Sequence, residues 1–364
     1  MKKLKISFVI YRPNLSGGAR VTAKHAQMLK QAGHDVTVTG LGKAHPSIRE
    51  RLRALKKGRI ARDILAYDQH FKDVGIEVKT IDYKDKIDAH DLPDADIVIA
   101  TFWRTAEWVN ALPANKGRKV YFVQSHEIFP QFPEDRVRAT YKMPMYKIAI
   151  AKWVARIMDT EYDSKNVRVV PNSADFSIFN APERQKNKTP RIGFLYAHAS
   201  VKGVDVTIKA IEKIRQTIPD LEIASFGSVK PNDELPLPNG CEFSHRPPQE
   251  KIRDIYASCD LWIVGSRIEG FHLPPIEAMA CRTPVVSTRV GGPEDLIVDG
   301  KNGYIVDIED DDTLAARGLE ILSSSPETWK TISQAAYETA ISFSWPEAGK
   351  KFEQALFEAI ETPV

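Results

Sequence analysis

Cysteine is scarce in this sequence, and no cluster of histidines or cysteines has the spacing of a metal site. The three cysteines, Cys241, Cys259 and Cys281, are too few and too scattered for a disulfide framework or a zinc site. The nine histidines show no zinc-ligand spacing either. We therefore expect no structural metal and a reducing, cytosolic setting.

A long apolar run is also absent. No stretch approaches the roughly 18 apolar residues of a membrane span, and the best candidate is interrupted by Lys152 and Arg156. The N-terminal segment, Met1–Ile10, has too short an apolar stretch for a signal peptide and lacks a small-residue cleavage site. We expect neither secretion by that route nor a membrane-spanning segment.

The composition is otherwise that of an ordinary globular protein. With 43% hydrophobic and 27% charged residues, the chain is unlike disordered, collagen-like or coiled-coil sequences. Its 364 residues predict two domains, or three, at roughly 150 residues per domain. The net charge of +3 hides an asymmetry, because residues 1–182 carry 31 Lys and Arg against 20 Asp and Glu, and the rest carry 20 against 28. A basic half of this kind suits an anionic partner or surface.

Short apolar segments alternate with helical segments along most of the chain. The apolar segments are rich in Val, Ile and Phe without strict alternation, which is typical of strands buried on both faces of a parallel sheet. The expected strands are 4–10, 35–39, 76–81, 96–101, 119–123, 191–196, 221–226, 261–264 and 284–287. The expected helices include 19–31, 204–217, 249–257, 275–280 and 346–360. This rhythm predicts a doubly wound α/β fold.

The alternation restarts after a polar, irregular stretch between 172 and 190. We therefore expect two Rossmann-like domains joined in this region, with a central cleft between them.

The segment 266–286 combines two carboxylates with a helix start. Gly270 lies in a loop and Pro275 marks the beginning of a helix, so backbone N–H groups and the helix dipole form a site that suits an anion. Glu269 and Glu277 are eight residues apart and can face the same cleft, where carboxylates accept hydrogen bonds from paired sugar hydroxyls. Taken alone, two such glutamates are more often a solvated loop residue and a dipole partner in the first helical turn.

The same segment resembles the donor-binding signature of retaining glycosyltransferases of family 4, which have the GT-B fold. The matching positions are Glu269, Gly270, Phe271, Leu273, Pro274, Glu277, 278–281 and 284–286. Positions 171–172, 175, 256, 260, 291–294 and 343–345 are also similar to the family, so that the resemblance covers nearly the whole chain. It implies an acceptor-binding domain, 1–171, and a donor-binding domain, 172–345, with a last helix, about 346–364, that packs back on the first domain.

The resemblance also implies roles for individual residues. Glu277 would hold the ribose hydroxyls of a nucleotide and Glu269 the transferred sugar. Lys202, which taken alone would be a solvated loop lysine, would stabilise the departing diphosphate as a point charge. The residues whose backbone would line the sugar and diphosphate are Gly270, Phe271, His272 and Leu273.

Two departures from the family pattern bear on these roles. Ala197 stands where the family usually has an arginine, which removes one cationic contact to the diphosphate, and His198 and Arg267 are the candidates to replace it. His272 and Arg282 stand where the family has glycines, so the side chain of His272 would lie next to the sugar pocket.

In the first half, Gly17 and Gly18 precede the helix expected at 19–31. A glycine pair lets backbone approach a ligand, with the helix N-terminus directed at a phosphate, although a plain tight turn would use the same residues. The resemblance implies that this loop lies near the donor phosphates and the acceptor. It also implies that His126, at the C-terminal end of a strand, orients the donor sugar; Glu127 beside it is a weaker candidate.

The stretch 43–62 has eight basic residues against one acidic residue. Ile48, Leu52 and Leu55 recur in it at helical spacing. The basic residues around them are Arg49, Arg51, Arg53, Lys56, Lys57 and Arg59. Three interpretations of this segment remain open. It is an interfacial helix on an anionic membrane, a helix that binds an anionic acceptor, or a solvated helix. Nucleic-acid binding is not expected, because no recognition motif supports it.

The resemblance and these features predict a retaining, metal-independent glycosyltransferase. It would move a sugar from a nucleotide-diphosphate sugar to a glycan or lipid-linked acceptor, in the synthesis of a bacterial-type surface polysaccharide or glycoconjugate. No cofactor or metal is expected, since Asp94 and Asp96 precede a strand, whereas the metal motif of the other glycosyltransferase fold ends one. The expected location is cytoplasmic, with peripheral attachment to the inner face of a membrane. A sugar-nucleotide epimerase and a non-catalytic, nucleotide-binding subunit of the same fold remain alternatives.

Overall fold

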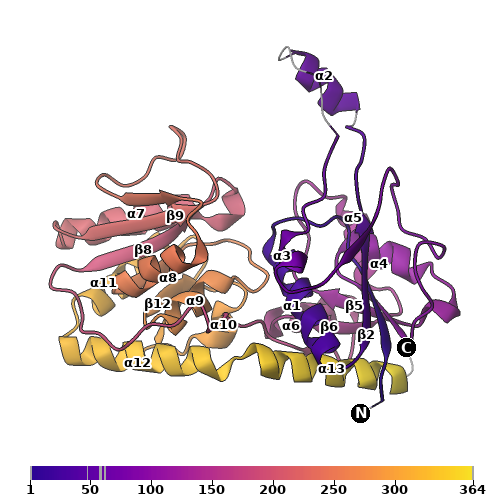
Figure 1. The fold of residues 1–364 in the computed structure, drawn as a ribbon. Helices are drawn as coiled ribbons and strands as arrows, with labels where there is room; N and C mark the ends of the chain where they lie inside the picture. Colours follow the sequence, from indigo (N-terminus) through magenta and orange to yellow (C-terminus); the bar gives the residue numbers. More distant parts are fainter. Residues whose placement is uncertain (1, 47, 57–59, 61–62, 363–364) are drawn as a thin grey trace. The chain divides into compact units, whose positions relative to one another are not determined.

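The computed structural model describes residues 2–362 apart from 47, 57–59, 61 and 62, and it describes only the backbone of Arg49 and Glu50. The contacts between residues divide the chain into two units. Unit 1 comprises Met1–Val170 and Pro346–Val364, and unit 2 comprises Pro171–Trp345. Each unit contains one parallel sheet with helices around it (Figure 1).

Unit 1 has a seven-stranded sheet in the order β3-β2-β1-β4-β5-β6-β7, and every neighbouring pair is parallel. Its strands are β1 (Lys5–Val9), β2 (Asp35–Leu41), β3 (Val78–Ile81), β4 (Ile97–Ala100), β5 (Arg118–Val123), β6 (Tyr146–Ala149) and β7 (Arg168–Val169). Its helices are α1 (Gly17–Gln31), α2 (Ile48–Lys56), α3 (Gln69–Lys72), α4 (Trp103–Asn110), α5 (Glu134–Tyr141), α6 (Lys152–Tyr162) and α13 (Trp345–Glu361), with a 3₁₀ turn, η1 (Ala114–Lys116).

Unit 2 has a six-stranded sheet in the order β10-β9-β8-β11-β12-β13, again all parallel. Its strands are β8 (Arg191–Tyr196), β9 (Glu222–Gly227), β10 (Glu242–His245), β11 (Leu261–Val264), β12 (Val285–Thr288) and β13 (Gly303–Val306). Its helices are α7 (Val204–Thr217), α8 (Gln249–Ser258), α9 (Leu273–Ala280), α10 (Pro293–Leu296), α11 (Asp311–Leu322) and α12 (Pro326–Ser342), with a 3₁₀ turn, η2 (Ser200–Lys202).

Both sheets reverse their winding beside the first strand of the unit. β1 lies between β2 and β4, and β8 lies between β9 and β11. The loops that follow β1 and β4, and those that follow β8 and β11, therefore leave the sheet toward opposite faces. This switch point, at the carboxyl ends of the strands, is where open α/β sheets bind ligands.

The predicted fold class, α/β with two Rossmann-like doubly wound sheets, is confirmed by this topology. All nine expected strands are present, and those at 191–196 and 261–264 agree residue for residue. Four further strands, β6, β7, β10 and β13, were not expected. The burial of β6 was not readable from its sequence, because the segment contains Lys147 and lysine is typical of exposed positions. In the structure, Lys147 is only 8% exposed. Its ammonium group donates hydrogen bonds to the carbonyls of Met143 and Met145, at 3.2 and 3.4 Å.

The C-terminal helix α13 completes the core of unit 1. The ring of Phe352 is fully buried and stacks on His25, with the ring centroids 4.3 Å apart. One turn of the same helix also carries Glu353, which pairs with the buried His34. The Leu4 N–H donates to Nδ1 of His34 at 3.1 Å, so Nε2 carries the proton and donates to Glu353 Oε1 at 3.0 Å. Residues from both ends of the chain therefore hold one core together.

No helix in the part of the chain that the structure describes is long and apolar enough to cross a membrane.

Shortening the buried side chain of Phe352 on α13 should destabilise unit 1. Phe352→Ala leaves a cavity among buried rings and is expected to cost about 3–5 kcal/mol of unfolding free energy. Ile360→Ala, on the same helix but 45% exposed, is the matched control and should cost less than about 0.5 kcal/mol. Urea unfolding followed by circular dichroism measures both. Equal, small effects of the two substitutions would contradict the assignment of α13 to the core.

Candidate functional site

The switch point of unit 2 brings the η2 turn against the loop that follows β11. The Arg267 and Ile268 N–H groups both donate to the Val201 carbonyl, at 2.8 and 3.2 Å. The two backbones approach so closely at Gly203 that an added Cβ would lie 1.8 Å from the Gly265 carbonyl oxygen, and Gly203 has a φ of +51°. Only glycine fits there, because an L side chain would meet both a clash and a left-handed backbone.

This contact creates a cluster of Lys202, Ser266, Glu269 and His272, which we call the Lys202 cluster. The Lys202 ammonium donates to both oxygens of Glu269, at 2.9 Å to Oε1 and 2.8 Å to Oε2. The Ser266 hydroxyl donates to Oε1 at 2.9 Å. The Nδ1 atom of His272 lies 3.0 Å from the same oxygen. Glu269 and His272 are 7% and 8% exposed, so the pair is screened little by water.

The protonation states in the Lys202 cluster follow from burial and from the neighbouring charges. Burial lowers the pKa of His272 to about 4, against the opposing effect of Glu269. Burial opposes the charge on Glu269, yet His272, Lys202 and Ser266 outweigh it and lower the pKa of that carboxyl. At neutral pH, the cluster therefore consists of a carboxylate, an ammonium group and a neutral imidazole.

Glu277 lies on α9 and is 6% exposed. The Tyr256 hydroxyl donates to its Oε2 at 3.1 Å. The expected helix start at Pro275 is wrong, since α9 begins at Leu273 and its first turn contains no acidic residue. Glu277 is therefore not a first-turn dipole partner. Because Pro274 and Pro275 lack an N–H, the start of α9 also offers fewer donors to an anion than an ordinary helix N-terminus.

The other residues that were expected to line the sugar and the diphosphate pack against a second loop that contains glycines. Phe271 is 3% exposed, and its carbonyl accepts a hydrogen bond from the Gly292 N–H at 2.7 Å. A Cβ at Gly291 would lie 2.9 Å from the Gly270 carbonyl oxygen. Leu273 is the first residue of α9. These contacts hold in place the backbone segment that directly follows Glu269.

The two candidates to replace the missing arginine at Ala197 are differently placed. Arg267 donates to both oxygens of Asp205, at 2.8 and 2.7 Å, and to Glu309 and the Ser200 carbonyl. Its donors are therefore already used within the protein. His198 is exposed, and its Nε2 donates to the Lys230 carbonyl at 2.9 Å.

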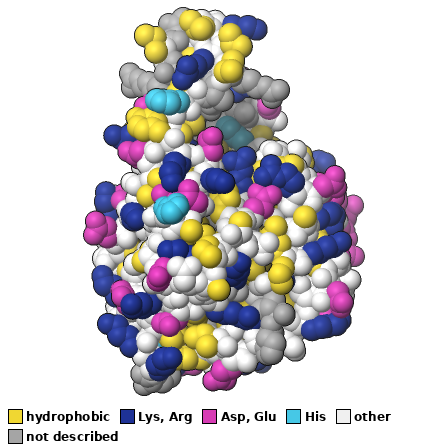
Figure 2. Space-filling model, turned by 90° about the vertical axis from the view of Figure 1, so that its right-hand side faces the viewer, with side chains coloured by type: hydrophobic (Ala, Val, Ile, Leu, Met, Phe, Trp, Pro, Cys, Tyr) yellow, Lys and Arg dark blue, Asp and Glu magenta, His cyan; other side chains and the backbone are white. Residues whose placement is uncertain are grey.

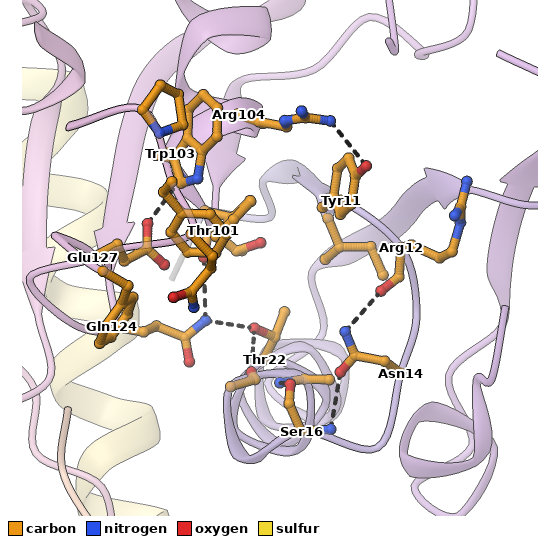
Figure 3. Close-up of a pocket in the computed structure, with 18 of the residues that line it drawn as sticks. Tyr11, Arg12, Asn14, Ser16, Thr22, Thr101, Trp103, Arg104, Gln124 and Glu127 are labelled. Atoms are coloured by element: carbon orange, nitrogen blue, oxygen red, sulfur yellow. Dashed lines mark hydrogen bonds between the residues drawn. The ribbon is translucent and has the colours of Figure 1, made fainter. Parts of the chain in front are cut away.

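Unit 1 has a pocket of about 600 Å³ at its own switch point. It is lined by the loops that follow β1, β4 and β5 and by the start of α1 (Figure 3). Of the glycine pair, Gly18 lines the pocket and Gly17 does not. Much of the apolar wall is aromatic, with Tyr11, Phe71, Phe102, Trp103, Phe129 and Phe132 lining the pocket.

Polar groups converge on this pocket from the segments that follow three strands, β1, β4 and β5. The Gln124 amide donates to the Thr22 hydroxyl at 3.1 Å, while its own Oε1 atom is buried and has no hydrogen-bond partner among the described residues. Arg104 donates to the Tyr11 hydroxyl at 2.9 Å, a bond drawn in Figure 3. The indole N–H of Trp103 is also buried, and no acceptor contacts it in the part of the chain that the structure describes. Unused donors and acceptors of this kind, beside aromatic rings, suit a polyhydroxylated ligand.

Glu127 is the one carboxyl group among the described residues that line the pocket. It is 8% exposed, and its Oε2 accepts a hydrogen bond from the Trp103 N–H at 2.9 Å, at the start of α4. Burial raises the pKa of Glu127 to about 8, although the bonds from Trp103 and Tyr121 oppose the rise. The carboxyl is therefore mostly protonated at neutral pH and is itself a hydrogen-bond donor.

His126 does not line this pocket. Its Nε2 lies 2.7 Å from the Tyr162 hydroxyl, which also accepts a bond from Arg138 at 3.0 Å. The structure thus brings Glu127, the weaker of the two sequence candidates, to the pocket. Four of the pocket residues, Tyr11, Trp103, Arg104 and Gln124, were not expected from the sequence. Their position in the sequence could have identified them, because each directly follows, or lies near, the carboxyl end of a strand at a switch point.

The basic segment forms α2, which extends away from the sheet of its unit (Figure 1). An antiparallel bridge between Ala44 and Ile64 closes its base. Ile48, Leu52 and Leu55 are 76%, 56% and 69% exposed. Figure 2 shows apolar and basic side chains together on this projection. Arg51, Arg53 and Lys56 lie on α2, whereas Lys57, Arg59 and the side chain of Arg49 lie outside the described residues.

Among the described residues, no group of three or more His, Cys, Asp or Glu side chains could hold a metal ion. The Asp-x-Asp sequence has structural partners instead. Asp94 pairs with Lys116 at 2.8 Å, and Asp96 accepts a hydrogen bond from the Lys5 N–H at 2.7 Å.

Comparison with known proteins agrees with this geometry. Residues 176–339, most of unit 2, match the sequence model of the family described as "Glycosyl transferases group 1". The chain is 30% identical over 158 residues to an uncharacterized glycosyltransferase of Methanocaldococcus jannaschii, covering 42% of this chain and 43% of that protein. It is 31% identical over 202 residues to a D-inositol 3-phosphate glycosyltransferase of Paenarthrobacter aurescens, covering 50% of this chain and 49% of that protein. The chain thus spans about half the length of the curated relatives it matches.

Among solved structures, HepE from Anabaena in complex with UDP-glucose superposes with a TM-score of 0.71 at 16% identity, covering 98% of this chain and 100% of that one. A likeness at this identity establishes the fold alone. The GT-B type of fold, with two Rossmann-like units, is thereby confirmed.

The buried carboxyl of Glu127 should make stability depend on pH. Since its folded pKa is raised, the folded state holds a proton that the unfolded state releases, and stability should fall as pH rises from the unfolded value to about 8. Glu127→Gln removes this contribution. Wild type should therefore lose stability relative to the variant between pH 5 and pH 8, by at most about 1.4 kcal/mol per pH unit. Parallel stability curves in chemical denaturation would refute the raised pKa.

Proposed function

We propose that this protein is a glycosyltransferase that moves a sugar from a nucleotide-diphosphate sugar to a hydroxyl group of an acceptor. The observation that carries the proposal is the Lys202 cluster, a paired ammonium and carboxylate at the switch point of the unit that matches the group 1 glycosyl transferases. The names of the curated relatives support the activity. The UDP-glucose complex of a structural neighbour supports the class of donor.

The donor would bind unit 2 through the groups that already converge there. Glu277, held by Tyr256, has the chemistry to accept the two hydroxyls of a ribose. Lys202 would neutralise the charge that develops on the departing diphosphate. Glu269 would accept hydroxyl hydrogen bonds from the transferred sugar and orient it. We further propose retention at the anomeric carbon and no metal requirement, in line with the family resemblance of the sequence.

The acceptor would bind the pocket of unit 1. Aromatic rings pack on the apolar faces of a sugar or cyclic polyol, while Gln124, Trp103 and Glu127 supply hydrogen bonds to its hydroxyls. Arg12 and Arg104 line the same pocket and would accommodate an anionic group on the acceptor. This chemistry is compatible with a glycan or lipid-linked acceptor in the synthesis of a surface polysaccharide or glycoconjugate.

The α2 helix would place this acceptor site at an anionic membrane. Its apolar side chains have large exposed fractions, and Arg51, Arg53 and Lys56 accompany them on the same helix. An apolar stripe with basic flanks is the pattern of a helix that lies at a lipid interface. Such attachment would place the protein peripherally on the inner face of the membrane.

Donor binding is tested by isothermal calorimetry or thermal shift with UDP, GDP, dTDP and ADP and their glucose conjugates, without metal and then with magnesium. Selective binding of one nucleotide without metal is the expected result. Absence of binding to every nucleotide would overturn the proposal. Binding without transfer to any acceptor would favour the non-catalytic alternative, which the alanine at position 197 also suggests.

The role of Glu269 is tested by Glu269→Gln, which keeps the shape but removes the charge. Transfer or donor hydrolysis should fall at least about 100-fold in kcat, the scale of losing one electrostatic contact in an active site. Glu338→Gln, an exposed carboxylate on α12, is the control and should be unaffected. Circular dichroism establishes that both variants fold. Wild-type turnover by folded Glu269→Gln would remove this residue from the site.

Membrane attachment is tested by co-sedimentation with vesicles of phosphatidylglycerol and of phosphatidylcholine. Leu52→Ser with Leu55→Ser should abolish binding to the anionic vesicles, because the apolar face is lost. Arg51→Gln, Arg53→Gln and Lys56→Gln together should weaken it by about 1 kcal/mol per removed charge. Val298→Ser, at a residue of unit 2 that is 57% exposed, is the control. Unchanged sedimentation of the leucine variant would exclude α2 as the contact.

A further inference from the structure

His272 occupies a backbone position that histidine rarely adopts. Its φ is +64° and its ψ is +82°, and it is the residue that caps the start of α9. A left-handed backbone costs free energy in any residue with a Cβ, and glycine would avoid that cost. The chain nevertheless carries a histidine there, and its side chain is nearly fully buried. Such strain persists where the surrounding contacts determine it, so the side chain should have a function.

The contact that holds His272 is the one with Glu269. Its Nδ1 lies 3.0 Å from Oε1, and that oxygen accepts from Ser266 as well. In a neutral ring, only a proton on Nδ1 makes this 3.0 Å contact attractive, because a carboxylate oxygen accepts and carries no proton of its own. The neutral imidazole then has Nε2 unprotonated. His272 therefore holds one oxygen of Glu269 from the side of the α9 start, independently of Lys202.

Lys202 makes the contact that must change when a diphosphate binds. Its ammonium now spans both oxygens of Glu269 and is the only hydrogen-bond donor to Oε2 among the described residues. An incoming diphosphate carries more charge than this carboxylate and would draw the ammonium toward itself. Oε2 would then lose its partner, while Oε1 would keep Ser266 and His272.

We propose that His272 is a positioning residue that holds Glu269 in place when Lys202 turns to the diphosphate, so that the released Oε2 faces the hydroxyls of the transferred sugar. This inference rests on the proposed function. The diphosphate and the sugar are thereby coupled through one carboxylate, because the first frees the oxygen that the second needs. Without His272, Glu269 would still pair with Lys202 but would lose its orientation once the ammonium left.

The test compares UDP with UDP-glucose in calorimetry on wild type and His272→Gly, or the corresponding nucleotide pair if the panel above selects another base. UDP needs only Lys202 and Glu277, so its affinity should change less than about twofold. UDP-glucose also needs the positioned Glu269, so its affinity should fall about tenfold, the loss of one hydrogen bond to a charged group. The kcat for transfer should fall as well. His272→Asn, which tolerates the left-handed backbone and retains an N–H donor, should recover part of the loss.

Two further measurements separate positioning from a merely structural role. Asn166→Gly relieves a left-handed residue in unit 1, with a φ of +60°, and controls for the effect of glycine itself. Nitrogen-15 spectra of the imidazole should show a neutral ring protonated at Nδ1 at pH 7, a signature that Glu269→Gln should change.

Each outcome addresses a different claim. Failure of wild type to bind any nucleotide overturns the proposed function. Wild-type binding of both ligands by His272→Gly, or an equal loss of both, overturns the role of His272 while leaving the proposed function intact. A ring protonated at Nε2 in wild type also overturns the role of His272.

Discussion

The close approach of two backbones at the switch point of unit 2 is the constraint on which its site depends. β8 and β11 are neighbours in a parallel sheet, so their following loops start side by side at one edge. Gly203 and Gly265 allow those loops to touch without side chains between them. Lys202 and Glu269, 67 residues apart in the chain, are consequently held within hydrogen-bond distance. A larger residue at Gly203 would separate the charges before any ligand arrived.

Glu127 and Glu269, which are both buried, illustrate how environment alone assigns opposite properties to the same side chain. Glu269 faces an ammonium group and is held ionised, whereas Glu127 faces aromatic rings and two hydrogen-bond donors that do not compensate for its burial. The first can neutralise a cation or accept from hydroxyls, and the second can donate. Divergent pKa values of this kind are a feature of sites that separate acidic from basic roles, and here each unit carries one of them.

The sequence was sufficient for the fold class, and its family resemblance singled out Lys202, Glu269 and His272, which the structure brings together. It was insufficient where a buried polar group has an unusual partner. Strands at 191–196 and 261–264 are uninterrupted apolar runs, so their boundaries were readable. β6 was missed because Lys147 interrupts it, and only the structure shows the two carbonyls that its ammonium contacts. The start of α9 was misplaced because the pattern places proline at the first position, whereas here Leu273 precedes two prolines. The partners Tyr256 and Ser266 could not be assigned, since their roles depend on tertiary contacts.

The return of α13 to unit 1 has a consequence for the order in which the protein is made. Unit 1 requires Phe352 and Glu353 to fill its core and satisfy His34, yet these residues leave the ribosome only after the whole of unit 2. Unit 2 is one continuous stretch, Pro171–Trp345, and all of it emerges earlier. Domains generally fold as units during synthesis. Unit 1 therefore remains incomplete, with an open apolar surface around His25, until α13 has been synthesised. Unit 2 is already able to fold by then.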